Sequence, residues 1–405
     1  MSLDVVDGRS AHGQMAALRD LVMRDQALQA HLAAMAFRSD FVDALVEAAR
    51  ERGGEAAADY MASFVQVDPL GLSRFQQPVW GAPDAPQTGW LPSQVGLNEG
   101  VPVVDWVRFG DRRLSDAFYE TSVRWALSQP FNSLFRFQTP LTALSDWAAG
   151  LPSVQPAGFI FHMSRCGSTL AAQMLARSPA NIVISEAAPI DAVAQLARLY
   201  PAYAGEAGEA LLRDMVGVFG QVREPDAQRL FLKLDGWHAL MLPLFRRAFP
   251  DTPWVFLYRD PLEVMVSQMR QRGSQLVPQF VPPSFYGIDL PTGVPDEDYC
   301  ARVLAATCEA ALDGHALGGG LVVNYHELPG ALLAKILPHF GVTPTPEEAG
   351  LMAEAAQFDA KSPGFAFTPD SAAKRAEASP AITRICADRM LDSYRRLEAL
   401  RAAQG

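Results

Sequence analysis

The chain has 405 residues, which is enough for two or three domains of ordinary size. Hydrophobic residues make up 49% of it and charged residues 20%, a balance that excludes a largely disordered chain. The formal net charge is −11, the wrong sign for a protein that coats nucleic acid or anionic lipid. Any anionic ligand must therefore be held by a local cluster of cations.

No stretch reaches the roughly 20 consecutive apolar residues that a membrane-spanning helix requires. The opening segment carries Asp4 and Asp7 where a secretory peptide would carry cations, so we expect a cytoplasmic protein. The seven histidines do not occur at metal-ligand spacing with a second ligand, and we expect no metal. Four cysteines are too scattered for a disulfide framework and are expected to be reduced: Cys166, Cys300, Cys308 and Cys386.

Residues 1–150 are expected to form a mainly helical accessory region. Apolar residues at helical spacing from residue 14 to about residue 64 predict a helical hairpin or small bundle. We then expect a strand at 101–109, helices at 117–127 and 141–149, and a loop at 130–140. Core packing accounts better than an acceptor pocket or an interface for five of the seven tryptophans, Trp80, Trp90, Trp106, Trp125 and Trp147.

From residue 151 to residue 405 the pattern becomes regular, because short apolar runs alternate with helical segments. This predicts an α/β domain with a parallel sheet flanked by helices. The five runs are residues 159–163, 182–185, 230–234, 254–258 and 321–324. Ligands of such sheets bind beyond the carboxyl ends of the strands, so the residues that follow each run are the candidates for a site.

The first run leads into a short polar loop before a helix: Arg165, Cys166, Gly167, Ser168 and Thr169. Backbone N–H groups and hydroxyls at a helix N-terminus bind phosphate or a similar oxyanion, and Arg165 adds a cation. A nucleotide-hydrolase loop would need Lys directly after Gly167, where Ser168 stands, so ATP with magnesium is disfavoured. A Ser/Thr-rich cap on an ordinary helix is the alternative.

The fourth run is followed by Arg259, Asp260 and Pro261. Asp260 is suited to cap a helix and Pro261 to occupy its first position. This places Arg259 at the carboxyl end of the strand and Ser267 about two turns along the helix, where both can face the crevice beside the first loop. Alternatively, Arg259 pairs with Asp260 or another carboxylate, and Ser267 is a routine helix residue.

Together, the two segments resemble the sulfotransferases that use 3′-phosphoadenosine 5′-phosphosulfate (PAPS) as donor. That family carries a loop like R/K-x-G-[ST]-T after its first strand and an R-[DN]-P segment followed by a serine after a later strand. The resemblance covers about residues 157–342 and implies a P-loop-like sulfotransferase fold. It implies that the first loop binds the phosphosulfate end of the donor, while Arg259 and Ser267 hold the phosphate on its ribose. Cys166 stands where the family commonly has Ser.

The resemblance also implies cations at the bridging oxygen that leaves with the nucleotide. Arg165 is the first candidate. Lys233 is the second, since a lysine inside an apolar strand needs an anionic partner. The alternatives are that Lys233 pairs with Asp235 or that its ammonium snorkels to water at the end of the strand. Basic residues near the carboxyl end are further candidates for gripping the ribose phosphate: Lys361, Lys374 and Arg375.

A base must remove the proton of the attacking acceptor, and we expect Glu186, which follows the second run, to be that base. His162 and His238 are the alternative bases. Glu186 could instead have a structural role, because its negative charge near the N-terminus of the next helix interacts favourably with the helix dipole. The proline-rich segment 273–295 could cover the acceptor or form a surface excursion.

The sequence therefore predicts a metal-independent sulfotransferase that moves a sulfuryl group from PAPS to a hydroxyl or amine. The acceptor could be a small molecule, carbohydrate, lipid or peptide, and the protein could be a homodimer. Nucleic acid is not an expected partner. A P-loop nucleotide kinase and a non-catalytic nucleotide-binding adaptor of the same fold are the alternatives.

Overall fold

The computed structural model describes residues 8–51, 82–278, 280–289, 291, 293–361, 364–366 and 370–404, with side chains from residue 16 onward. Trp80 and the predicted helical residues beyond 51 lie outside this part of the chain. The chain divides into two compact units. One comprises Met1–Arg113, Glu120–Ser153 and Gly217–Pro225, and the other comprises Leu114–Tyr119, Val154–Val216 and Asp226–Gly405.

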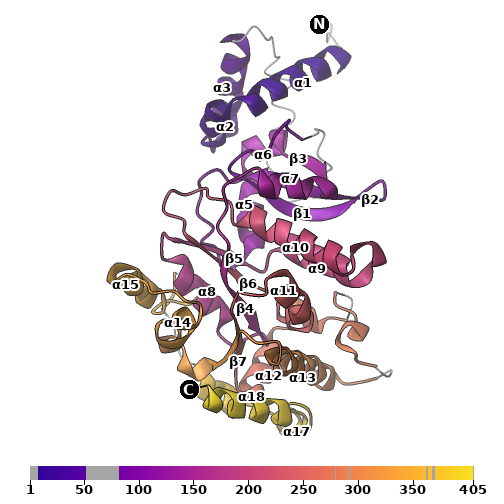
Figure 1. The fold of residues 1–405 in the computed structure, drawn as a ribbon, viewed down its shortest axis with the longest axis vertical. Helices are drawn as coiled ribbons and strands as arrows, with labels where there is room; N and C mark the ends of the chain where they lie inside the picture. The colour runs from indigo at the N-terminus through magenta and orange to yellow at the C-terminus, as the bar shows by residue number, and fades with distance from the viewer. Residues whose placement is uncertain are drawn as a thin grey trace, which may run out of the picture. The chain divides into compact units, whose positions relative to one another are not determined.

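The first unit begins with three helices, α1 (Gly8–Arg24), α2 (Gln26–Ala33) and α3 (Arg38–Glu51), shown in indigo in Figure 1. Their apolar residues recur at helical spacing, and Leu32, Phe41 and Leu45 are completely buried. Asp25 caps α2 by accepting a hydrogen bond from the Leu28 N–H. The predicted helical hairpin is confirmed over these residues.

An antiparallel sheet completes this unit, with the strands in the order β1-β2-β3. Its elements are β1 (Trp90–Asn98), β2 (Val101–Arg108), α5 (Tyr119–Ser128), α6 (Pro130–Phe135), β3 (Phe137–Pro140) and α7 (Leu144–Ala149). The predicted loop at 130–140 was wrong. Phe131 and Phe135 lie on one side of a short helix and are buried in the core, and the buried Phe137 starts a strand. Burial of these rings stabilises regular structure more than the flanking prolines favour a loop.

The tryptophans of this unit are mostly core residues. The Trp106 and Trp147 rings stack with centroids 4.0 Å apart, and Trp90 lies 4.8 Å from Phe137. Trp125 differs because it is 39% exposed and carries the Arg112 guanidinium 4.1 Å from its ring centroid. Core packing is thus confirmed for the three buried tryptophans but not for Trp125.

The second unit contains a five-stranded parallel sheet in the order β5-β6-β4-β7-β8. The strands are β4 (Pro156–His162), β5 (Asn181–Ser185), β6 (Arg229–Lys233), β7 (Trp254–Tyr258) and β8 (Gly320–Asn324). Each contains most of one predicted apolar run, and β5 and β7 are buried along their whole length. A sheet covered on both faces requires such runs, and the predicted α/β class is confirmed.

Helices cover this sheet on both faces (Figure 1). The helices of this unit are α8 (Ser168–Ala176), α9 (Ala188–Leu199), α10 (Glu206–Phe219, which ends in the first unit), α11 (Leu242–Ala248), α12 (Pro261–Arg270), α13 (Asp296–His315), α14 (Leu337–His339), α15 (Pro346–Ala355), α16 (Ser371–Glu377), α17 (Pro380–Arg389) and α18 (Leu391–Ala403). α8 packs on β4, β5 and β6, whereas α13 and α18 pack on β8. Among the described residues, no helix has both the length and the apolar character needed to cross a membrane.

The strand order places a crevice between the carboxyl ends of β4 and β7. The connection that leaves β4 leads to β5 on one side of the sheet, whereas the connection that leaves β7 leads to β8 on the other side. Ligands of open parallel sheets bind where neighbouring connections diverge in this way. The two sequence segments that predicted an anion site are the loops at this point.

Candidate functional site

The loop between β4 and α8 has a backbone that few residues adopt. Ser164, Arg165 and Gly167 have positive φ angles of 78°, 52° and 85°. A Cβ atom on Gly167 would lie 2.8 Å from Cδ2 of Tyr325, so glycine is required here by conformation and by space. Strained residues of this kind concentrate where a structure binds ligands or performs chemistry.

Core contacts fix the loop in place. The Cys166 thiol donates a hydrogen bond to the Leu257 carbonyl at 3.0 Å, and burial raises the pKa of the thiol to about 12. The Ser164 N–H donates to His162 Nδ1, and the Gln268 amide donates to the Ser164 hydroxyl, each at 3.0 Å. Gly167 directly precedes α8 and has no side chain that could accept hydrogen bonds from the first-turn N–H groups. A ligand anion could accept these hydrogen bonds instead.

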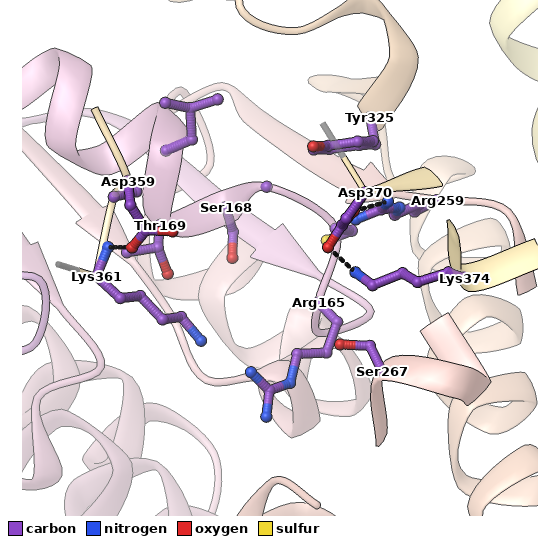
Figure 2. Close-up of a pocket in the computed structure, with 14 residues that line it drawn as sticks. Arg165, Ser168, Thr169, Arg259, Ser267, Tyr325, Asp359, Lys361, Asp370 and Lys374 are labelled. Carbon is purple, nitrogen blue, oxygen red and sulfur yellow. Dashed lines mark hydrogen bonds and ion pairs between the residues drawn. The ribbon is translucent and has the colours of Figure 1, made fainter. Parts of the chain in front are cut away.

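A pocket of about 240 Å³ opens beside this loop. Figure 2 shows its lining, which comes from the second unit only. Of the predicted site residues, the pocket brings together Arg165, Cys166, Gly167, Ser168, Thr169, Arg259, Ser267, Lys361 and Lys374. Leu170, Tyr325, Asp359, Ala360 and Asp370 complete the lining. Glu186 and Lys233 are not among these residues.

Arg259 is a buried cation at the far end of the pocket from Lys361 (Figure 2). Its Nε donates to Glu263 at 2.7 Å and its Nη2 to Asp370 at 2.9 Å, and its guanidinium lies 3.9 Å from the centroid of the Tyr325 ring. Arg259 therefore pairs with carboxylates of the protein, which was the predicted alternative to binding a ligand anion. Its partners are Glu263 and Asp370 rather than Asp260.

Asp260 instead caps α12, as predicted, by accepting hydrogen bonds from the Leu262 and Glu263 N–H groups. This cap fixes the start of the helix on which Ser267 reaches the pocket. Arg375, one of the basic candidates, forms ion pairs with Asp260 and Glu263 and does not line the pocket.

Asp370 joins the two cations at this end of the pocket. One of its carboxylate oxygens contacts Arg259, and the other lies 2.7 Å from Lys374 Nζ (Figure 2). Sequence reasoning missed Asp370, although an Asp directly before Ser371 and a helical segment is a typical helix start. It also missed that Tyr325, in the segment after the last strand, would stack on Arg259.

Two further cations lie at the loop end of the pocket. Figure 2 shows the side chains of Lys361 and Arg165 reaching toward one another from opposite sides of the pocket. The pKa of Lys361 is lowered by removal of water from its ammonium and by the positive charges of Arg165 and Lys233. Arg165 Nη2 also donates to the Gln271 carbonyl at 2.7 Å. An anion between these cations would relieve their mutual repulsion.

Lys233 and Glu186 form an ion pair beside this loop, in which the lysine is buried and the glutamate is partly exposed. The Lys233 side chain has no exposed surface, and its partner is Glu186 and not Asp235. Burial alone would raise the pKa of Glu186, but the Lys233 ammonium and a contact with His162 outweigh burial and lower it. Glu186 has a positive φ of 52°, and one of its oxygens lies 3.4 Å from His162 Nε2. Burial lowers the pKa of His162, which favours the neutral imidazole.

Phe118 connects the two lysines. Its ring centroid lies 5.0 Å from Lys233 Nζ and 5.6 Å from Lys361 Nζ. It comes from the short segment Leu114–Tyr119, which belongs to the second unit although both flanking segments belong to the first. No local sequence pattern indicated this placement.

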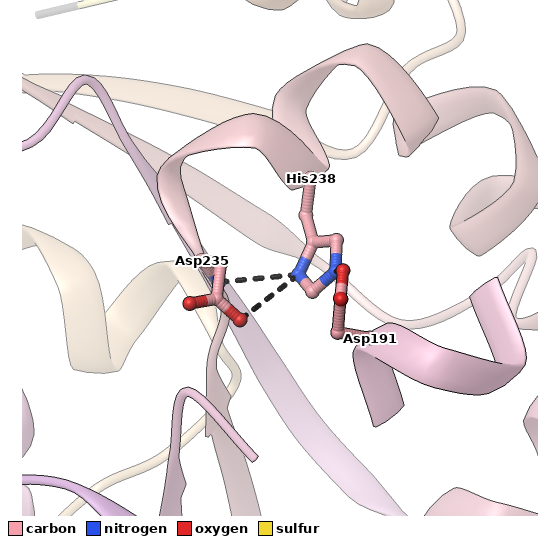
Figure 3. A group of neighbouring side chains, drawn as sticks. All are labelled: Asp191, Asp235 and His238. Carbon is pink, nitrogen blue, oxygen red and sulfur yellow. Dashed lines mark hydrogen bonds and ion pairs between the residues drawn. The ribbon is translucent and has the colours of Figure 1, made fainter. Parts of the chain in front are cut away.

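A second polar group, Asp191, Asp235 and His238, brings three possible metal-ligand atoms within 4.8 Å of one another (Figure 3). Asp191 accepts hydrogen bonds from His238 Nε2 at 2.8 Å and from the Trp237 indole at 2.6 Å. Burial alone would lower the pKa of His238, but the hydrogen bond to Asp191 and the negative charge of its carboxylate outweigh burial and raise it. Because these side chains already bond to one another and His238 Nδ1 accepts a hydrogen bond from the Asp235 N–H, we interpret the group as a hydrogen-bonded network. The sequence expectation that no histidine stands at metal-ligand spacing with a second ligand overlooked Asp235-x-x-His238.

Burial and the nearby carboxylates of Glu186 and Asp191 raise the pKa of Asp235 to about 7. Asp235 also starts the short helical turn Gly236–Met241, where its side chain accepts from the His238 N–H. Its carboxyl group is therefore far easier to protonate near neutral pH than that of Glu186.

The segment 273–295, a candidate cover for the acceptor, is attached to α9. Arg198 Nη2 donates to the Phe285 carbonyl at 2.8 Å, and the Arg198 guanidinium lies 3.7 Å from the centroid of the Phe285 ring. Phe285 and Tyr286 are buried, whereas Phe280 is 74% exposed. None of these aromatic residues lines the pocket of Figure 2.

Solved structures that match part of this chain include three sulfotransferases. The sulfotransferase domain from the curacin biosynthetic pathway has 17% identity and a TM-score of 0.37, and the match covers 58% of this chain and 98% of that chain. The corresponding domain from the olefin synthase of Synechococcus PCC 7002 has 17% identity and a TM-score of 0.36, covering 61% and 95%. A sulfotransferase from Alicyclobacillus acidocaldarius has 16% identity and a TM-score of 0.36, covering 62% and 96%.

No protein-family model and no curated protein matches the chain. At identities of 16–17% and TM-scores of 0.36–0.37, these matches carry no conclusion about function. A function must therefore be argued from the residues of the pocket.

Proposed function

We propose that this protein is a sulfotransferase that moves a sulfuryl group from PAPS to a hydroxyl or amine acceptor. The observation that carries the proposal is the convergence of two anion-binding groups on one pocket. Arg165 and the start of α8 line the same pocket as Arg259, Ser267 and Lys374, and Figure 2 shows Thr169 and Lys361 on the opposite side from Arg259 and Lys374. A nucleotide with one phosphate group at its 5′ end and another on its ribose would use both groups of anion-binding residues in this pocket.

The loop composition favours this donor over ATP. Ser168 stands where a P-loop kinase requires the lysine that reaches the outer phosphates. The cations at the loop end are instead Arg165 and Lys361, which approach from separate elements. We assign the phosphosulfate to this end and the ribose phosphate to Arg259, Ser267 and Lys374.

Transfer breaks the bond between sulfur and the oxygen that bridges it to the 5′ phosphate, and it forms a bond between sulfur and the acceptor atom. The electron pair of the broken bond stays on the phosphate, so cations at that oxygen stabilise the transition state. Arg165 and Lys233 are the proposed cations. Glu186 is the proposed base that receives the proton of the acceptor.

The pairing of Lys233 with Glu186 supports a coupled role for these two residues. While Lys233 pairs with Glu186, the pKa of the carboxylate is lowered, and the carboxylate is a weak base. If the ammonium turns toward the negative charge that develops on the leaving phosphate, Glu186 loses its counter-ion and its pKa rises. The base would then become stronger as the reaction proceeds.

Binding of the reaction product, 3′-phosphoadenosine 5′-phosphate (PAP), tests the donor class. We expect PAP to raise the melting temperature of the full chain more than AMP, ADP or magnesium-ATP at equal concentration, because ligands stabilise the state that they bind. Equal shifts with PAP and AMP would contradict the proposal. A larger shift with magnesium-ATP, accompanied by ATP turnover, would favour a kinase instead.

A further inference from the structure

The cations proposed for the ribose phosphate are already bridged by a carboxylate of the protein. Asp370 places one oxygen 2.9 Å from Arg259 Nη2 and the other 2.7 Å from Lys374 Nζ (Figure 2). Charge-assisted hydrogen bonds from two cations to separate oxygens are also what a bound phosphate would receive. The Asp370 carboxylate thus occupies the place that the proposed function gives to a ligand phosphate.

The two sides of this cluster differ in burial. The side chains of Arg259 and Lys374 are 5% and 7% exposed, whereas that of Asp370 is 42% exposed. Arg259 is also held from its other side by Glu263, whose side chain is 4% exposed. Glu263 is therefore a fixed counter-ion that keeps the guanidinium in position. Asp370 lies on the solvent side, where it can be exchanged for another anion.

We propose that the Asp370 carboxylate competes with the ribose phosphate of the donor for Arg259 and Lys374. This competition sets the affinity of the protein for the donor. This proposal rests on the proposed function, and in it Asp370 passes through three successive states. It pairs with Arg259 and Lys374 in the free protein, it leaves when a phosphate dianion binds, and it returns as PAP departs. Since a phosphate monoester carries more charge and more acceptor oxygens than a carboxylate, the exchange favours the phosphate.

This exchange has two consequences. Without donor, Asp370 keeps two buried cations paired, which avoids the cost of uncompensated buried charge. With donor or product bound, the displaced carboxylate competes for the same cations and promotes release of PAP. A nucleotide without the ribose phosphate, such as AMP, has no group that displaces Asp370.

The variant Asp370→Asn tests the inference, because it removes the negative charge and keeps the size and a residue type suited to a helix start. Glu377→Gln is the matched control. Glu377 lies on the same helix, α16, and the change in net charge is the same, but its partner is the exposed Arg270 outside the pocket. Calorimetry on the full chain measures the dissociation constants of PAP and AMP, and stopped-flow displacement measures the release rate of PAP.

We expect Asp370→Asn to bind PAP about tenfold more tightly and to release it correspondingly more slowly, with less than about a twofold change for AMP. Glu377→Gln should behave as the unsubstituted protein. Asp370→Ser, which also suits a helix start, replaces the Asn variant if that variant does not fold.

Unchanged or weaker PAP binding by the Asp370 variant would overturn the inference, and so would an equal gain in Glu377→Gln. In both cases the proposed function stands as long as the unsubstituted protein prefers PAP over AMP. No such preference in the unsubstituted protein would instead remove the proposed function, and the inference with it.

Discussion

Lys233 shows how a single side chain links the core to the candidate site. Its side chain is wholly buried at the end of β6, where an unpaired ammonium would be strongly unfavourable. Glu186 provides the counter-charge from the end of β5, the neighbouring strand. The pair therefore contributes to stability in the free protein as well as standing beside the proposed reaction centre.

We expect Glu186→Gln to lower turnover by at least about 100-fold while PAP binding is retained, because a positioned base contributes that much and Glu186 does not line the donor pocket. Steady-state rates and PAP titration measure the two effects. A variant that keeps full turnover would remove Glu186 as the base. If the unsubstituted protein transfers no sulfuryl group to any acceptor yet binds PAP, it is an adaptor rather than an enzyme.

The same variant carries a stability prediction with a defined pH dependence. The pKa of Glu186 is lowered in the folded protein, so its contribution is present above the unfolded pKa and is lost as the pH falls. We expect Glu186→Gln to cost on the order of 3 kcal/mol at pH 7 in urea unfolding, and less at pH 4. Glu209→Gln, which breaks the pair with the more exposed Arg247, serves as control and should cost under about 1 kcal/mol.

At the scale of elements, α12 links Arg259 and Ser267, the two residues proposed to bind the ribose phosphate. Arg259 precedes the helix and Ser267 lies on it, so the position of its first turn sets the distance between them. Asp260 and Pro261 define that turn by capping and by a fixed backbone angle. This local pattern was predictable because it depends on residues adjacent in the chain.

We expect Asp260→Ala to destabilise the protein by about 1 kcal/mol and to weaken PAP binding roughly fivefold, since the loosened helix start moves both Arg259 and Ser267. Ser379→Ala is the matched control because Ser379 caps α17 by accepting from the Ile382 N–H. It should cost similar stability with unchanged PAP affinity. Equal effects of the two variants on affinity would show that Asp260 acts through general stability alone.

At the scale of the whole molecule, the chain enters each compact unit more than once. Gly217–Pro225 belongs with the first unit, where the Val222 N–H donates to the Pro152 carbonyl at 2.8 Å. Arg223, which is 9% exposed, donates to the Arg112 carbonyl at 2.9 Å. Conversely, Leu114–Tyr119 delivers Phe118 to the second unit. A single boundary at residue 150 therefore separates segments that fold together.

We expect a fragment of residues 151–405 to lose cooperative thermal unfolding, because it separates Gly217–Pro225 from the unit with which this segment packs and removes Phe118 from the two lysines. Circular dichroism measures the transition. Co-expression with residues 1–150 should restore it. A fragment that melts like the full chain and responds equally to PAP would show that the second unit is autonomous.

Local sequence pattern determined the five strands, the α/β class and the helix start at Asp260, because continuous apolar runs must be covered and caps involve near neighbours. It also identified the two loops that meet at the pocket, since the carboxyl ends of parallel strands share one edge. The helix and strand within 130–140 were missed, because burial of aromatic residues overrode the turn signals there.

Only the tertiary structure decided which charges meet. Lys233 and Glu186 are 47 residues apart in the chain, and Arg259 and Asp370 are 111 residues apart. Such pairs depend on how successive connections cross the sheet, and no periodicity within one segment encodes that crossing. The sequence thus placed cations around the pocket, whereas the packing of distant segments chose the carboxylates that pair with them.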